Sequence, residues 1–327
     1  MKQTPSATDK VKLDRVDLSL SRICFGLAPL GSLPATYGYG VSTEDAHATV
    51  RAIFDSGIGF LDTSRNYGLG RSEERVGDVV RERGGLPPGL VISSKLDRDF
   101  KTHHFDAARA RRSLEESLKA LGVDKIQLLH LHDPEWALSL DDITKPNGVI
   151  AELFRMKEEG LADAVGLAAG RTDIMIPMLD AWDFDALMTH NRFTLANRNA
   201  DPMIDLAVKR KIAVLNAAPY AGGVLAKGSV AQPRVAYQMA SAETLKPIEH
   251  IEQICARHGI PPGAAALQFS MRDPRIASTV VGISKPERIA QTLAWASHPI
   301  SEEAWAELLA LPYETDDPEA TRVHTLG

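Results

Sequence analysis

Short apolar runs alternate with longer amphipathic runs along most of the chain, and this alternation limits the possible folds more than any other feature. The strand-like runs cover residues 22–26, 58–62, 90–95, 126–132, 162–167, 186–189, 212–217 and 277–281. Strands that alternate with helices predict parallel βαβ units. Eight strands in this pattern predict a protein of the α/β class, a (β/α)8 TIM barrel.

Helix-like runs with the 3.6-residue period lie between most of these strands. Ser42 and Asp45 form a pair similar to a capping box and predict the start of the first helix, which Gly57 ends. Asp201-Pro202 predicts the start of another helix, because proline suits the first helical position. Further helices are predicted at residues 72–83, 105–121, 149–159, 243–258, 286–296 and 301–311.

The chain of 327 residues suits one barrel domain over residues 1–327, because such barrels take about 250 residues plus their longer loops. Residues 11–20 alternate in polarity and predict a hairpin across the barrel floor, whereas the polar residues 1–10 are expected to be disordered. Long loops follow three strands, at residues 29–41, 133–147 and 218–242. We expect these loops on the C-terminal face of the barrel, where they shape a pocket.

Four titratable residues lie at or just beyond the ends of predicted strands: Asp62, Tyr67, Lys95 and His132. Because the strands of a parallel barrel end on one rim, these side chains are expected to meet there. Tyrosine is a weak acid with a pKa near 10, and a neighbouring ammonium group favours its phenolate form. Such a group is suited to proton transfer at a carbonyl or an alcohol. No side chain carries hydride, so redox chemistry at this rim needs a nicotinamide cofactor.

The sequence around these residues resembles the aldo-keto reductase family. The matching strings are Phe-Leu-Asp-Thr-Ser at 60–64, Asn-Tyr-Gly at 66–68, Ile-Ser-Ser-Lys at 92–95 and Leu-His-Leu-His-Asp-Pro at 129–134. The resemblance extends over residues 16–314 and implies a catalytic tetrad. In this tetrad Tyr67 is the general acid and base, and Lys95 lowers its pKa. Asp62 holds Lys95, and His132 orients the substrate oxygen.

Two further strings narrow the resemblance within the family. Leu-His-Asp-Pro-Glu at 131–135 and Ala-Ala-Pro-Tyr-Ala-Gly-Gly-Val-Leu at 217–225 look most like the L-fucose, D-threo-aldose and L-galactose dehydrogenases and a pyridoxal 4-dehydrogenase. This implies an NAD(P)-dependent oxidoreductase that transfers hydride between nicotinamide and the C1 hemiacetal of an aldose, giving a lactone, or a related aldehyde. A pyridoxal-type dehydrogenase, a general aldehyde reductase and a non-enzymatic, cofactor-binding regulatory subunit are the alternatives.

The resemblance also implies a set of cofactor-binding residues: Asn191, Pro219, Gly222, Leu225, Gly282, Ser284, Arg288 and Gln291. The predicted helix that begins near residue 286 has an N-terminus suited to phosphate. No Gly-x-Gly-x-x-Gly follows the first strand, so the Rossmann fingerprint is absent. Gly282 stands where the family often has a lysine for the 2′-phosphate, whereas Arg288 offers a fork that binds phosphate. We expect NAD or NADP, with NAD used at least as well.

Other classes of function are less compatible with the sequence. His130 and His132 share one strand face, as in some metal hydrolases, but the last two strands end without an imidazole or carboxylate, so we predict no metal site. A net charge of -6 argues against nucleic acid as a partner, and no apolar run approaches the roughly 20 residues of a membrane helix. Cys24 and Cys255 lie in apolar patterns typical of core residues. We therefore expect a cytoplasmic protein with a small sugar or aldehyde as substrate, its oligomeric state being left open.

Overall fold

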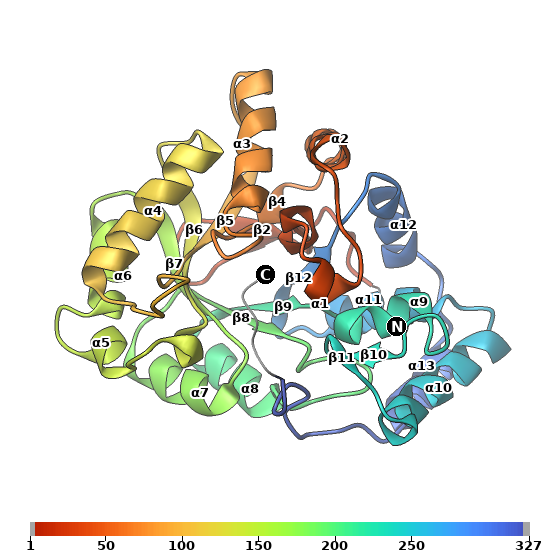
Figure 1. Cartoon of the computed structure of the whole chain (residues 1–327). Coiled ribbons are helices and arrows are strands. Elements are labelled where there is room, and N and C mark those ends of the chain that lie inside the picture. Colours follow the sequence, from red (N-terminus) through yellow and green to blue (C-terminus); the bar gives the residue numbers. More distant parts are fainter. Residues whose placement is uncertain (1–3, 323–327) are drawn as a thin grey trace.

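A closed barrel of eight parallel strands forms the centre of the computed structural model, which describes residues 4–322 (Figure 1). The strands are β3 (Ile23–Gly26), β4 (Phe60–Asp62), β5 (Val91–Leu96), β6 (Ile126–His132), β7 (Ala162–Ala168), β8 (Ala186–His190), β9 (Ala213–Ala217) and β12 (Ile276–Gly282). They follow the chain order around the barrel, which closes where β12 pairs with β3. The predicted (β/α)8 class and its eight strands are confirmed.

Helices surround the barrel on its outer side (Figure 1). Those predicted from the sequence are α2 (Thr43–Phe54), α3 (Arg71–Arg83), α4 (Ala107–Leu121), α6 (Val149–Glu158), α8 (Asp201–Lys209), α10 (Ala242–Arg257), α12 (Glu287–Ala296) and α13 (Glu302–Ala310). The first begins as expected, because the Ser42 side chain accepts a hydrogen bond from the backbone N–H of Asp45. The apolar faces of these helices pack on the strands and form the outer hydrophobic core.

Two helices that belong to the barrel have weak sequence patterns. Helix α7 (Thr172–Ala181) contains Pro177, and proline inside a helix removes a backbone hydrogen-bond donor. Helix α11 (Pro262–Arg272) is rich in alanine and buried along most of its length, so it lacks the one-sided pattern of a surface helix. It packs against β12 and takes the place in the barrel that the sequence assigned to residues 243–258, which form the additional helix α10.

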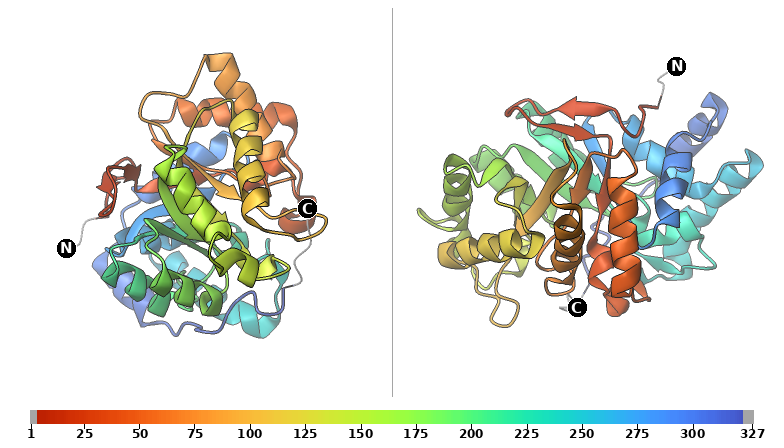
Figure 2. Two further views of the ribbon diagram at one scale, coloured as in Figure 1. Left: turned by 90° about the vertical axis from the view of Figure 1, so that its left-hand side faces the viewer. Right: turned by 90° about the horizontal axis from the view of Figure 1, so that it is seen from above.

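A hairpin of β1 (Lys10–Lys12) and β2 (Ser19–Ser21) crosses the end of the barrel opposite the long loops (Figure 2). Leu13 and Leu20 of this hairpin are buried with the inward-facing Phe60 and Leu128, which closes the barrel floor as predicted. The structure describes residues 4–10 of the segment that was expected to be disordered. Residues 4–10 run beside β3, where the carbonyl oxygen of Ala7 accepts a hydrogen bond from Ile23. Residues 1–3 lie outside the described chain.

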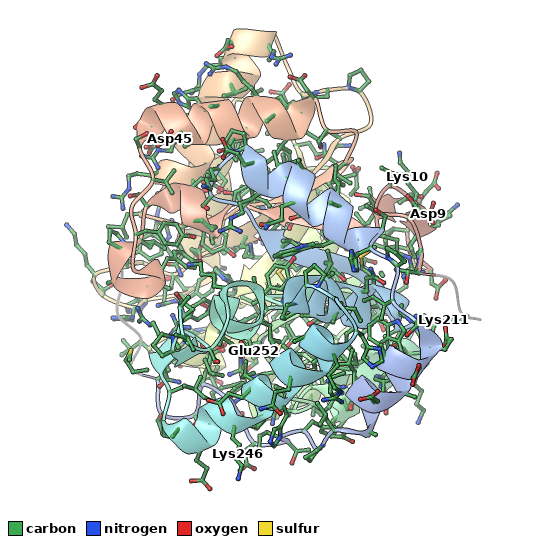
Figure 3. All side chains as sticks on the ribbon, turned by 90° about the vertical axis from the view of Figure 1, so that its right-hand side faces the viewer. Asp9, Lys10, Asp45, Lys211, Lys246 and Glu252 are labelled. Atoms are coloured by element: carbon green, nitrogen blue, oxygen red, sulfur yellow. The ribbon has the colours of Figure 1, made fainter. Side chains whose placement is uncertain are left out.

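The three long loops all lie at the other end of the barrel, as predicted. The first holds α1 (Pro34–Tyr37), the second α5 (Asp141–Thr144), and the third α9 (Val224–Lys227) with a short hairpin of β10 (Arg234–Val235) and β11 (Gln238–Met239). Figure 3 shows how far apart the two ends are, with Asp45 of α2 at the loop end and Asp9 and Lys10 at the floor. A site built on the loops is therefore separated from the floor by a packed interior.

Both cysteines are buried and free, which confirms that they are core residues. Over residues 4–322, no helix is long and apolar enough to cross a membrane.

Candidate active site

An ion pair between Asp62 and Lys95 lies at the centre of the site. Asp62 is the last residue of β4, and Lys95 lies near the end of the neighbouring strand β5. The Lys95 Nζ atom is 2.8 Å from each carboxylate oxygen of Asp62 and 2.7 Å from the carbonyl oxygen of Thr63. Both side chains are at most 2% exposed. Each of the three ammonium protons has an acceptor, so the lysine is held rigidly.

Tyr67 lies in the loop after β4, where two loops approach each other closely. Gly68 has a φ of 67°, and a Cβ atom at this position would collide with the carbonyl oxygen of Gly31, so only glycine fits. The Tyr67 ring centroid is 4.6 Å from the Lys95 Nζ atom and 6.0 Å from the centroid of the His132 ring. The structure thus brings together the four residues that the sequence predicted to meet.

The pKa of Tyr67 shifts in the direction opposite to the one expected. Burial raises it well above its ordinary value, and the negative charge of Asp62 adds to this effect. We expected the ammonium group of Lys95 to lower the pKa, but Asp62 is in direct contact with Lys95 and balances its charge. The phenol of Tyr67 is therefore held in its protonated form.

His132, the last residue of β6, is paired with a carboxylate that the sequence analysis did not identify. Its Nδ1 atom is 2.6 Å from Oδ1 of Asp97, which is fully buried just beyond β5. Asp97 lies two residues after Lys95, and residues at this spacing share a strand face, so the signal for its position was present in the sequence. Burial lowers the pKa of His132, but the charges of Asp133 and Asp97 outweigh burial and raise it.

His130 lies inside the barrel and supports the ion pair. Its Nδ1 atom is 3.2 Å from the Ser93 hydroxyl, which donates a hydrogen bond to Asp62. Gly166 makes room for the imidazole, because a Cβ atom there would collide with it. Burial and the charge of Lys95 lower the pKa of His130 well below its ordinary value, which keeps it neutral. In the described part of the chain, no three His, Cys, Asp or Glu side chains are grouped as metal ligands.

The four residues line a single large cavity of about 1140 Å³ at the loop end of the barrel. Ligand pockets usually measure about 300–1000 Å³, so this one has room for a dinucleotide together with a small substrate. All three long loops contribute to its lining, for example through Tyr37, Trp136 and Tyr220, as predicted. The segment after α13 also lines the cavity, through Asp317, Glu319, Ala320 and Arg322, and no local pattern in the sequence predicted this.

The structure divides the predicted cofactor-binding residues into two groups. Gly222, Gly282, Ser284, Arg288 and Gln291 line the cavity. Asn191, Pro219 and Leu225 are not part of its lining, and the Leu225 side chain is fully buried in the hydrophobic core, which argues against a direct contact through this side chain.

Asn191 is connected to the cavity through Glu319. Its Nδ2 atom donates a hydrogen bond of 2.8 Å to this carboxylate, which also accepts from Arg192 and lies 3.1 Å from Nε2 of His190. Oδ1 of Asn191 is buried and has no hydrogen-bond partner among the described residues. These contacts fix the C-terminal segment across the strand ends of β8, and Arg322 adds a further ion pair to Glu319.

Positive charge gathers at the part of the cavity formed by α9 and the start of α12. Lys285 and Arg288 belong to the turn and first residues of α12, and Lys227 ends α9. Burial and the charge of Arg288 lower the pKa of Lys227, so these two cations lie close to each other. The Lys227 Nζ atom also lies 5.1 Å from the ring centroid of Tyr39. Clustered cations at a helix N-terminus are suited to phosphate groups.

A barrel whose strand ends bring a tyrosine, a histidine and a lysine–carboxylate pair into one dinucleotide-sized cavity defines a class of oxidoreductases. Comparison with known proteins gives the family. The model of the aldo/keto reductase family matches residues 22–311, and the chain belongs to this family. The expectations of an aldo-keto reductase and of an oxidoreductase enzyme are therefore confirmed. Members of the family use NAD(P)H as cofactor.

Three curated relatives are each 29% identical to the chain. They are a pyridoxal 4-dehydrogenase of Microbacterium luteolum, a D-threo-aldose 1-dehydrogenase of a Pseudomonas species and an L-galactose dehydrogenase of Arabidopsis thaliana. The alignments cover 92%, 89% and 86% of this chain and 97%, 94% and 86% of the relatives. These are the groups that the strings at 131–135 and 217–225 resembled.

Solved structures agree on the fold. An aldo-keto reductase of Bacillus halodurans, solved in its holo form, superimposes with a TM-score of 0.76 at 19% identity and covers 96% of this chain and 99% of its own. A glycerol dehydrogenase of Gluconobacter oxydans gives a TM-score of 0.71 at 21% identity, with coverages of 92% and 94%.

Proposed function

We propose that this protein is a cytoplasmic dehydrogenase that transfers hydride between NAD(P) and C1 of an aldose, forming the lactone in the oxidative direction and reducing a related aldehyde in the other. The observation that carries the proposal is the convergence of Asp62, Tyr67, Lys95 and His132 at one cavity. Tyr67 is the proposed proton donor in reduction, because its raised pKa keeps the hydroxyl protonated. In oxidation the deprotonated form of the same residue takes the proton from the substrate hydroxyl. The two free cysteines support a reducing compartment.

The residues of the cavity fit a nicotinamide dinucleotide, which supplies or accepts the hydride when bound. Lys227, Lys285 and Arg288 are the proposed phosphate-binding residues. Asn191 is proposed to act indirectly, because it does not line the cavity and its Nδ2 atom donates a hydrogen bond to Glu319, which does.

An unpartnered carboxylate oxygen of Glu135 supports a substrate with several hydroxyl groups. Oε1 of Glu135 accepts hydrogen bonds from the backbone N–H groups of Gly170 and Arg171, at 2.9 and 3.2 Å. Oε2 is buried and has no partner within residues 4–322, and Glu135 and Asp133 both line the cavity together with His132. Carboxylates only accept hydrogen bonds when ionised, so this pair is suited to the hydroxyl groups of a sugar. An apolar aldehyde would leave Oε2 of Glu135 unsatisfied.

The proposal is tested by following the ultraviolet absorbance of reduced nicotinamide with a panel of aldoses, pyridoxal and simple aldehydes, each with both cofactors. Turnover of aldoses with lactone as product supports it. Turnover of pyridoxal in preference to every aldose would favour the pyridoxal dehydrogenase alternative. The similarity to the pyridoxal 4-dehydrogenase of Microbacterium luteolum supports this alternative. Failure of all substrates with both cofactors would contradict the proposed activity.

Glu135→Gln is expected to raise the KM for an aldose by about 10–100-fold, because a hydrogen bond to a charged group contributes about 1.5–3 kcal/mol. The glutamine keeps an acceptor for the two backbone N–H groups and places a donor where Oε2 lies. The KM for an aldehyde without hydroxyl groups is expected to stay the same. Asp141→Asn, an exposed carboxylate of the same loop, is the matched control. Equal KM changes for both substrates would contradict hydroxyl recognition by Glu135.

We further propose that NAD is used at least as well as NADP. Asp45 of α2 and Glu287 of α12 line the cavity, and Glu287 directly precedes Arg288. Carboxylates favour a ribose hydroxyl over a phosphate. Gln291 also engages the Arg288 guanidinium.

Arg288→Ala is then expected to raise the Kd of both cofactors by a similar factor, about 3–10-fold, because the contact is with the part of the adenosine end that both share. Quenching of protein fluorescence measures both values, and Arg51→Ala, at an exposed ion pair on α2, is the control. A wild-type preference for NADP of tenfold, about 1.4 kcal/mol, together with selective loss of NADP binding in the variant, would contradict the proposal.

A further inference from the structure

Asp97 occupies a position in which every oxygen of its carboxylate has a partner. Oδ1 is 2.6 Å from Nδ1 of His132. Oδ2 accepts hydrogen bonds from the hydroxyl of Ser64 at 2.6 Å and from the backbone N–H of Asn66 at 2.9 Å. The backbone N–H of Asp97 donates to Ser113 at 2.9 Å. Asp97 is fully buried and does not line the cavity. Its contacts therefore indicate that it supports other residues and does not contact a ligand itself.

These contacts determine which ring nitrogen of His132 is available to the cavity. A carboxylate only accepts hydrogen bonds, so the proton between the two side chains belongs to Nδ1 of His132. The other ring nitrogen, Nε2, lies 3.7 Å from Oδ2 of Asp133, and both residues line the cavity. In histidines that act in catalysis or bind metals, the partner of one ring nitrogen selects the tautomer and orientation of the ring in this way.

We propose that Asp97 is a positioning residue for hydride transfer: its carboxylate holds the Nδ1 proton of His132, so that Nε2 meets the substrate oxygen. The substrate oxygen comes from the proposed function, on which this part of the inference rests. The pairing of Asp97 with His132 does not depend on it.

The charged and titratable groups around His132 come from three neighbouring strands and their loops. Asp97 and Lys95 belong to β5 and its end, Asp62 and Tyr67 to β4 and its loop, and His130, Asp133 and Glu135 to β6 and its loop. Burial and Lys95 disfavour the imidazolium form, whereas the charges of Asp133 and Asp97 favour it and give a raised pKa. Burial is the largest single effect and disfavours the ionised form of Asp97, but the charge of His132 and the hydrogen bonds from His132, Ser64 and Asn66 together lower the pKa of Asp97.

This pairing changes which group responds to pH. Tyr67 stays protonated far above neutral pH. His132 is therefore the group whose charge changes closer to neutrality, above the ordinary histidine pKa. Below its pKa, Nε2 donates a hydrogen bond to the carbonyl oxygen in reduction. Above it, Nε2 loses this proton, while Nδ1–H stays bound to Asp97.

Asp97→Asn removes the charge but keeps the shape of the side chain. The pKa of His132 is expected to fall, so the limb of the pH–rate profile for reduction moves to lower pH by about one unit or more, and kcat at neutral pH falls by about 10–100-fold. KM and the cofactor Kd are expected to change little. Asp99→Asn is the matched control, since Asp99 only caps its own exposed turn through Lys101 and Thr102. An unmoved profile with unchanged kcat would overturn the proposal.

A double-variant cycle tests whether Asp97 acts through His132. Asp97→Asn combined with His132→Gln is expected to have the kcat of His132→Gln alone, because the histidine that Asp97 positions is already absent. Additive losses would assign Asp97 a separate structural role and overturn the inference. Urea unfolding of each variant separates loss of activity from loss of the fold.

Nitrogen-15 NMR of the histidine side chains in the wild-type protein provides a measurement that needs neither activity nor a stable Asp97 variant. Assignment by comparison with His132→Gln identifies the relevant ring. A protonated Nδ1 that is protected from exchange with solvent, at pH values on both sides of the His132 titration, is the expected result. An unprotonated Nδ1 would overturn the pairing even if turnover is found. A protonated Nδ1 without turnover of any substrate would instead count against the proposed function.

Discussion

Tyr67→Phe is expected to lower turnover by about 10²–10⁴-fold, the usual contribution of a general acid or base. The substitution removes only the hydroxyl group. The ring keeps its contact with Lys95, 4.6 Å from the centroid, and its edge-on contact with His132, so the fold and cofactor binding should be preserved. The measurements are kcat in both directions and the cofactor Kd. Because the pKa of Tyr67 is raised, reduction by the wild type should not lose its Tyr67 proton donor anywhere near neutral pH.

Tyr313→Phe is the control for this experiment, since Tyr313 is 49% exposed and lies outside the cavity lining. Its kcat should equal that of the wild type. If Tyr67→Phe turns over within a factor of a few of the wild type, the proton at the substrate oxygen comes from another group, and the proposed role of the tyrosine is wrong. His132 would then be the first residue to examine.

Lys95→Met is expected to destabilise the protein by about 3–5 kcal/mol as well as to abolish most turnover. The substitution leaves the carboxylate of Asp62 buried without its partner, and an uncompensated buried charge has a cost of this size. Urea unfolding measures the loss of stability. Lys125→Met is the matched control, because its ion pair with Asp163 is about 40% exposed on both sides, and such pairs contribute about 1 kcal/mol or less.

A second variant separates the structural role of the pair from its role in catalysis. Replacing both residues, with Lys95→Met and Asp62→Leu, removes both charges and fills the space with apolar groups, which is often neutral for stability. The double variant should therefore recover most of the stability lost in Lys95→Met, but none of the turnover. Recovery of turnover in the double variant would show that the pair only supports the fold. A stable Lys95→Met variant would mean that water or another cation compensates Asp62.

The barrel and the four central residues could be predicted because their signals are local. Alternating strand and helix patterns identified the strands, and Asp62 and His132 stand at strand ends that must share one rim. Helix α7 was missed because Pro177 interrupts it, and α11 because burial on all sides removes the amphipathic period. The position of Asp97 was implied by the two-residue spacing from Lys95, but spacing gives no indication of which imidazole the side chain would reach.

The sequence by itself determined the order of the elements, the family and the identity of the residues at the strand ends, because periodicity, capping and motif strings act over a few residues. Only the tertiary structure decided how those residues behave. Asp97 meets His132 across 35 positions of the chain, and Glu319 meets Asn191 across 128. The pKa of Tyr67 rises because loops from several parts of the chain bury it. The charge of Lys95, which would lower this pKa, is balanced by Asp62. The burial and the charge balance of a residue depend on all the residues around it, and folding alone brings those residues together.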